Sequence, residues 1–127
     1  YAEPAGELVS IRENNGYLID CDMMAALVKV YDPSGDNQTN PLAWPFHASV
    51  NELRGLPPHV ISVNELDPLR DEGLAYYRKL RQAEVTCAAR TVHGTPHAGD
   101  MGFPDITPDL YQETQDALYR FALNVAD

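Results

Sequence analysis

Apolar side chains recur every three or four positions between residues 23 and 31, and this spacing predicts an amphipathic helix. Asp20 or Asp22 supplies a side-chain oxygen that can cap the first turn of this helix. The run DPSGD at residues 32–36 favours a turn and ends the helix. A long loop through residues 41–46 is expected to follow.

The second half of the chain alternates between helix-like and strand-like patterns. Residues 49–52 (SVNE) have capping-box spacing and predict a short helix. β-branched residues predict a short buried strand over 59–63, and an apolar stripe predicts a helix over 69–83. Residues 85–92 are expected to form a second strand. A proline at the first helical position and an apolar face predict a terminal helix over 107–125.

The order strand, helix, strand, helix from residue 59 onward predicts an α/β fold. Two strands joined by a crossover helix pair in parallel, and parallel strands need cover on both faces. Two strands with two helices provide little of that cover. We therefore expect residues 59–127 to be the edge of a larger sheet, with residues 1–58 adding a helix and loops to the same domain.

Composition and charge narrow the classes of partner. Nine basic against nineteen acidic side chains give a net charge of −10, which argues against a nucleic-acid partner. No apolar run is long enough for a transmembrane helix, so we expect no membrane span. Two cysteines are too few for a disulfide framework, and the compartment stays open, with the cytoplasm favoured.

Residues that carry chemistry follow both predicted strands. Asp67 follows the first strand and His97 follows the second, where α/β enzymes gather their functional groups. A carboxylate that accepts a hydrogen bond from one imidazole nitrogen leaves the other nitrogen free as a general base. The pattern alone is weak, because an Asp-Pro pair near a helix start is more often a turn or a cap. Asp71 and Glu72 are expected only to favour the helix dipole.

A longer run carries a family resemblance. Residues 53–73 (LRGLPPHVISVNELDPLRDEG) resemble the C-terminal part of the hormone-sensitive-lipase family of α/β-hydrolase esterases, which has a Leu-Pro-Pro lead-in to a strand and an Asp-Pro-Leu-Arg-Asp-Glu-Gly motif. Residues 94–97 (GTPH) resemble the triad-histidine loop of that family. Residues 16–19 (GYLI) and 40–46 (NPLAWPF) look most like the brefeldin A esterase-like carboxylesterases within it.

The resemblance implies the C-terminal part of an α/β-hydrolase fold, with the last two parallel strands of the sheet and their flanking helices. It implies a serine-type carboxylic ester hydrolase in which Asp67 and His97 are the catalytic acid and histidine. The substrate would be a small-molecule ester, without a cofactor or a metal, and a homodimer is left open. Residues 98–100 (AGD) depart from the commonest family loop, which has Gly and then an aromatic residue, and we interpret this as subfamily variation.

Two parts of that family's machinery are absent from the 127 residues. No serine stands in a Gly-x-Ser-x-Gly elbow, and no His-Gly-Gly motif for an oxyanion hole occurs. We expect both on an N-terminal part of the same esterase, so that this chain alone is inactive. A non-catalytic small-molecule receptor on the same fold is the alternative, and the presence of both Asp67 and His97 argues against it.

Other residues offer competing interpretations. His93 is a rival base, but the Gly and Pro between it and His97 prevent one helix face from presenting both imidazoles. An oxygen-rich metal site is the least favoured interpretation, judged by ligand type. Its ligands would be Glu65, Asp67, Asp71 and His97. Three apolar residues could line an acyl pocket or belong to the core: Trp44, Phe46 and Met101.

Overall fold

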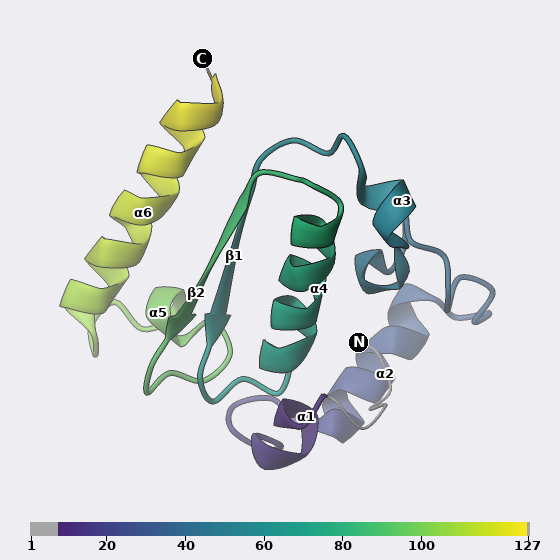
Figure 1. Cartoon of the computed structure of the whole chain (residues 1–127). Helices are drawn as coiled ribbons and strands as arrows, with labels where there is room; N and C mark the ends of the chain where they lie inside the picture. The colour runs from purple at the N-terminus through teal and green to yellow at the C-terminus, as the bar shows by residue number, and fades with distance from the viewer. Residues whose placement is uncertain (1–7, 127) are drawn as a thin grey trace.

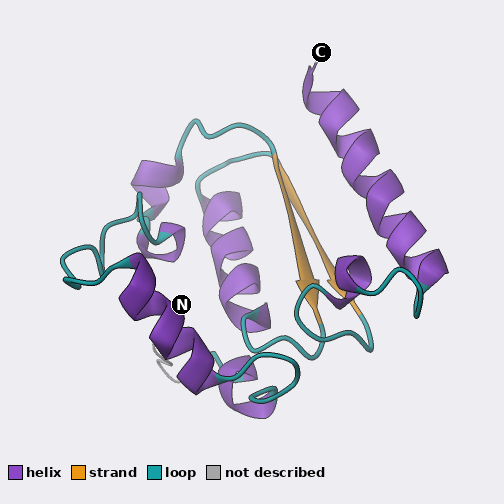
Figure 2. Ribbon diagram, turned by 180° about the vertical axis from the view of Figure 1, so that it is seen from behind, coloured by secondary structure: helices purple, strands orange, loops and turns teal. Residues whose placement is uncertain are grey.

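A two-stranded parallel sheet stands between helices in the computed structural model, which describes residues 8–126 (Figures 1 and 2). Strands β1 (His59–Asn64) and β2 (Cys87–Val92) pair in register from end to end. The crossover helix α4 (Arg70–Gln82) packs against both strands. The terminal helix α6 (Pro108–Ala126) lies on the other side of the sheet, with α5 (Gly99–Gly102) between it and the strand ends. The predicted parallel arrangement is confirmed.

Four helical segments precede the sheet: α1 (Ser10–Glu13), α2 (Cys21–Tyr31), the 3₁₀ turn η1 (Pro45–His47) and α3 (Val50–Leu53). The predicted cap of α2 is confirmed, because the Asp20 side chain accepts the Met23 N–H at 2.7 Å. Ser49 and Glu52 form the predicted capping box of α3. No helix in the described part of the chain is long and apolar enough to cross a membrane.

Some segments differ from the sequence prediction. α1 and α5 were not predicted, and η1 begins within the segment 41–46 that was expected to be a loop. Each is about one turn long, which is too short to show an apolar period. β2 begins at Cys87 rather than at residue 85, because the Val85 N–H bonds to the Leu80 carbonyl at 3.0 Å and still belongs to the end of α4.

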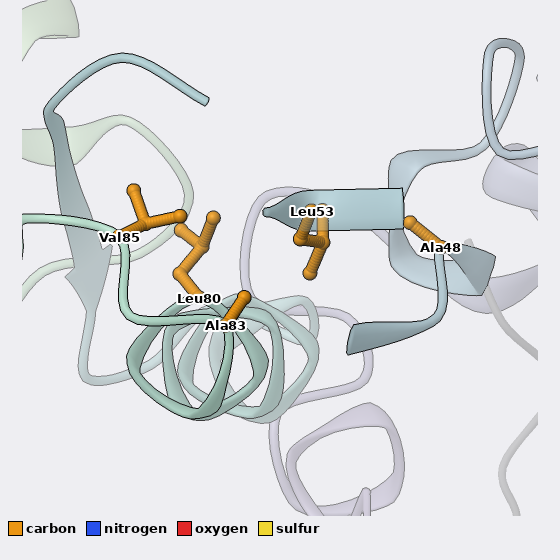
Figure 3. Packing of buried hydrophobic residues seen from close by; sticks show 5 residues of the cluster. All are labelled: Ala48, Leu53, Leu80, Ala83 and Val85. Atoms are coloured by element: carbon orange, nitrogen blue, oxygen red, sulfur yellow. The ribbon is translucent and has the colours of Figure 1, made fainter. Parts of the chain in front are cut away.

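The main apolar cluster joins α4 to α3 and lies away from the carboxyl ends of the strands. It contains Ala48, Leu53, Leu80, Ala83 and Val85, drawn as sticks in Figure 3. Leu80 is completely buried, and its side chain lies between Val85 and Leu53 in Figure 3. Truncating such a leucine to alanine costs about 2–5 kcal/mol of stability. The cluster therefore anchors the C-terminal end of α4 to α3, at the end of that helix remote from the loop after β1.

Close contact between α4 and β1 depends on Gly73. A Cβ atom at this position would lie 2.7 Å from Val63 Cγ1, which is shorter than a carbon–carbon contact allows. The absence of a side chain lets the first turns of α4 rest directly on the strand. The loop between them is thereby kept short and tight.

Gly73→Ala is expected to lower the free energy of unfolding by about 1–3 kcal/mol, because α4 must move away from Val63. Urea unfolding measures the change. Gly102→Ala is the control for the glycine-to-alanine change, since an added Cβ there meets no atom within 4 Å. Equal stability of the two variants would contradict the close-packing argument.

Candidate active site

Both strands end at the same edge of the sheet. The register pairs Asn64, the last residue of β1, with Val92, the last residue of β2. Two loops begin there side by side, which we name the acid loop (residues 65–69) and the histidine loop (residues 93–98). Loops in this position carry the functional groups of parallel α/β proteins.

Hydrogen bonds between the two loops continue the pairing beyond the strands. The Glu65 N–H donates to the Val92 carbonyl and the Leu66 N–H donates to the Thr95 carbonyl, both at 2.9 Å. The buried Thr95 hydroxyl donates to Asn64 Oδ1 at 2.6 Å. The acid loop and the histidine loop are therefore one hydrogen-bonded unit rather than two independent turns.

Asp67 and His97, the two residues selected from the sequence, meet at the end of this unit. His97 Nδ1 lies 2.9 Å from Asp67 Oδ2, and Asp67 Oδ1 accepts the Leu69 N–H at 2.8 Å. The Asp67 side chain is 10% exposed, whereas the His97 side chain is 42% exposed. An ionised carboxylate here holds the proton on Nδ1 and leaves the Nε2 lone pair free for a proton from outside. The arrangement suits a buried acid that orients a reachable base.

The acid loop is also held from α1, which the sequence patterns did not reveal. Asn14 Nδ2 donates to the carbonyls of Glu65 and Asp67, at 3.0 and 3.1 Å. The fully buried Ser10 hydroxyl donates to the Pro68 carbonyl at 2.8 Å. These bonds add to those that Arg70 makes with the Glu65 and Asp67 carbonyls, so the carbonyl groups of the turn are well satisfied. No local feature of residues 10–14 points to this role, because the partners are far away in the sequence.

Asp71 does more than favour the helix dipole, which corrects the sequence expectation. Its Oδ2 accepts the Ser10 N–H at 2.8 Å, and its Oδ1 accepts from Arg70 Nε at 2.9 Å. Burial raises the pKa of Asp71, but the hydrogen bonds from Arg70 and Ser10 outweigh this, so the pKa lies below its usual value. Asp71 thus ties α1 to the start of α4 as an ionised group.

His93, the rival base, has a carboxylate partner of its own. Its Nδ1 lies 3.4 Å from Glu65 Oε1, with 79% of the His93 side chain and 41% of the Glu65 side chain exposed. The Gly94 N–H donates to Glu65 Oε2 at 2.7 Å, and this bond, together with His93, lowers the pKa of Glu65. This second contact is longer and more open than the one between Asp67 and His97.

The four side chains considered as metal ligands do not converge. Asp67 contacts His97, Glu65 contacts Gly94 and His93, and Asp71 contacts Arg70 and Ser10. Among residues 8–126, no group of three or more His, Cys, Asp and Glu side chains is arranged to hold a metal ion. The described geometry therefore favours paired acid and imidazole groups over a shared cation.

Comparison with known proteins agrees with this geometry. Residues 3–100 match the family described as alpha/beta hydrolase fold. The chain belongs to the α/β-hydrolase fold family. The predicted fold class is thereby confirmed, and the two parallel strands with flanking helices are consistent with a C-terminal part of that fold.

Several esterases resemble this α/β hydrolase closely. Brefeldin A esterase, described as a bacterial homologue of human hormone-sensitive lipase, is 48% identical with a TM-score of 0.92, covering 94% of this chain and 33% of that one. Esterase Est22 is 38% identical with a TM-score of 0.84, over 94% and 35% of the two chains. An arylesterase of Saccharolobus solfataricus is 34% identical over 88 residues, which are 68% of this chain and 28% of the arylesterase. The predicted resemblance to the hormone-sensitive-lipase group is confirmed, and the chain spans about a third or less of these relatives.

The three apolar candidates occupy different places in this α/β hydrolase. Phe46 lines a cavity of about 310 Å³ that also reaches Asp67, with Ile61 and Tyr76 on other walls. Trp44 lines a separate cavity of about 580 Å³ beside α2. Met101 is 45% exposed on α5. The structure therefore brings only Phe46, of these three, to a hollow that contains a candidate site residue.

Asp71→Asn is expected to lower the free energy of unfolding at pH 7 by about 2 kcal/mol, because it removes hydrogen bonds to a charged group. A carboxyl whose pKa is lowered by folding stabilises the fold above its unfolded pKa, and that stability is lost as the pH falls through the folded pKa. The variant should therefore lose less stability than the wild type on acidification below about pH 4.

Urea unfolding at pH 7 and pH 3 checks both parts of this expectation. Asp36→Asn serves as the control, since Asp36 is an exposed loop residue for which stability should hardly change. Parallel pH curves for the wild type and Asp71→Asn would show that Asp71 does not couple protonation to folding.

Proposed function

We propose that this chain supplies the acid and the base of a serine-type carboxylic ester hydrolase. The observation that carries the proposal is the 2.9 Å contact between Asp67 Oδ2 and His97 Nδ1, made by loops that leave neighbouring parallel strands at one edge. The esterase names of the relatives support the same reaction class. The substrate is an ester of a small molecule.

His97 acts twice in the proposed reaction. Its Nε2 takes the proton from a serine hydroxyl while the serine oxygen attacks the ester carbonyl carbon. The imidazolium then gives this proton to the departing alcohol, which leaves an acyl-serine ester. Water attacks that ester with His97 again as the base, releasing the carboxylic acid and restoring the serine. Asp67 holds the Nδ1–H and stabilises the positive charge on the ring at each step.

The nucleophile is proposed to lie outside these 127 residues. Each of the four serines in the chain already takes part in a hydrogen bond through its hydroxyl oxygen: Ser10, Ser34, Ser49 and Ser62. None has the flanking glycines of a nucleophile elbow. A serine-bearing segment must therefore join this chain, and we call that combination the assembled esterase. The part of brefeldin A esterase that this chain does not span can serve as the segment.

The assembled esterase is expected to hydrolyse a short-chain acyl ester, whereas the chain alone is not. His97→Ala should lower kcat about 10⁴-fold, because the general base is lost. His93→Ala is the matched control, in which kcat should change by less than a few-fold. Release of p-nitrophenol from its acetate ester measures the rate of each of the four proteins.

Three results would count against this function. Equal hydrolysis by the chain alone would remove the need for a separate serine. A large loss in His93→Ala with little loss in His97→Ala would transfer the base role to the contact between His93 and Glu65. Tight ligand binding by the assembled protein without turnover would favour a receptor on the same fold.

A further inference from the structure

A buried carboxylate follows the histidine loop and has no part in the proposed reaction. Asp100 lies in the first turn of α5 and is 3% exposed. Its Oδ2 accepts a hydrogen bond from the Thr114 hydroxyl at 3.0 Å and lies 3.5 Å from Arg90 Nη2. A carboxylate is stable in such a place only when it is paired, so Asp100 has a defined position.

The partners of Asp100 come from two separate elements, and one of them reaches a third. Arg90, on β2, donates from Nη2 to the Thr114 hydroxyl on α6 at 3.1 Å. Arg90 Nε donates to the Ser62 hydroxyl on β1 at 2.9 Å. Thr114 is 2% exposed and therefore both accepts and donates within the buried group. Figures 1 and 2 show α5 between the ends of the strands and α6, which is where this network lies.

The backbone between His97 and Asp100 is constrained, so that the position of one residue depends on the position of the other. Ala98 has a φ of +52°, a left-handed conformation that a residue with a side chain adopts only under constraint. A Cβ on Gly99 would lie 2.8 Å from Pro96 Cδ, and the Gly99 N–H bonds to the Pro96 carbonyl at 2.9 Å. The segment has little room to relax, so a shift of Asp100 must move the histidine ring.

We propose that Asp100 is a positioning residue for His97, acting through its buried contacts with Thr114 and Arg90. The inference rests on the proposed function, because it concerns the base of that reaction. The network fastens the far end of the histidine loop to the sheet and α6, while the near end is held by the hydrogen bonds of Thr95 to Asn64 at the end of β1 and to Leu66 in the acid loop. The histidine loop is thus held at both of its ends, and the distance between His97 and Asp67 depends on the contacts at both ends. The departure of residues 98–100 from the commonest family loop acquires a physical role.

Hydroxyl replacement at Thr114 tests the inference in the assembled esterase. Thr114→Val keeps the shape but removes the donor to Asp100, and Thr114→Ser keeps the hydroxyl. Thr114→Val and Asp100→Asn are each expected to lower kcat roughly 10- to 100-fold with little change in KM, since small displacements of a catalytic group cost rates of this order. Thr114→Ser should stay within a few-fold of the wild type. The comparison between valine and serine remains decisive if Asp100→Asn does not fold.

A second readout separates positioning from simple loss of stability. A weaker contact with Asp67 stabilises the imidazolium less, so the acid limb of the pH profile of kcat/KM should move to lower pH in Thr114→Val. Leu53→Ala is the control: it creates a cavity in the core near α3, remote from the loops, and should leave kcat per folded molecule and the pH limb unchanged.

The outcomes distinguish this inference from the function on which it rests. If Thr114→Val and Asp100→Asn lose activity only in proportion to the unfolded fraction, with the pH limb unmoved, the positioning role is wrong while the ester hydrolase stands. The proposed function fails if the unsubstituted assembled esterase hydrolyses no ester, or if the His97→Ala variant retains full activity. The positioning role then fails with it.

Discussion

The register of the two parallel strands is the constraint on which the site depends. Asn64 and Val92 are paired at the last position of the ladder, so both loops begin side by side at the same edge of the sheet. A shift by one residue would turn every side chain of one strand to the opposite face and displace one loop relative to the other. The Glu65 N–H bond to the Val92 carbonyl continues this register, and the Leu66 N–H bond to the Thr95 carbonyl then joins the acid loop to the histidine loop. The contact between Asp67 and His97 is the end product of that register.

Support for the candidate pair comes from opposite ends of the described chain. α1 holds the acid loop through Ser10 and Asn14, and α6 contributes Thr114 to the buried group around Asp100. The sheet alone would place the two loops near each other without fixing the side chains. Precise placement requires the supporting polar groups to be satisfied and buried. The acid is buried more deeply than the imidazole, as suits a pair in which only the base meets a substrate.

Periodic and capped elements could be predicted from the sequence, whereas support from distant residues could not. The helical period of α2, the cap at Asp20 and the capping box at Ser49 are local features, and each predicts an element that the structure contains, although the apolar stripe predicted for α2 is exposed. The motif around Asp67 and the loop around His97 could also be recognised locally. Ser10 offered no such indication, because its bond to Pro68 crosses 58 residues and its neighbours show no pattern. The contact between Asp67 and His97 could therefore be predicted from the sequence, whereas the distant side chains that hold their loops could not.

The long separation between Ser10 and Pro68 has a consequence for the order of events in folding. Closing a loop of this length costs chain entropy, and contacts between distant segments tend to form late. The local turns and α4 can form before α1 docks, and Arg70 already bonds two carbonyls of the acid loop, but the bonds from Ser10 and Asn14 form only after docking. Local opening of α1 would release these partners while the sheet stays intact. Mild denaturant should thus loosen the acid before it disrupts the strands that position it.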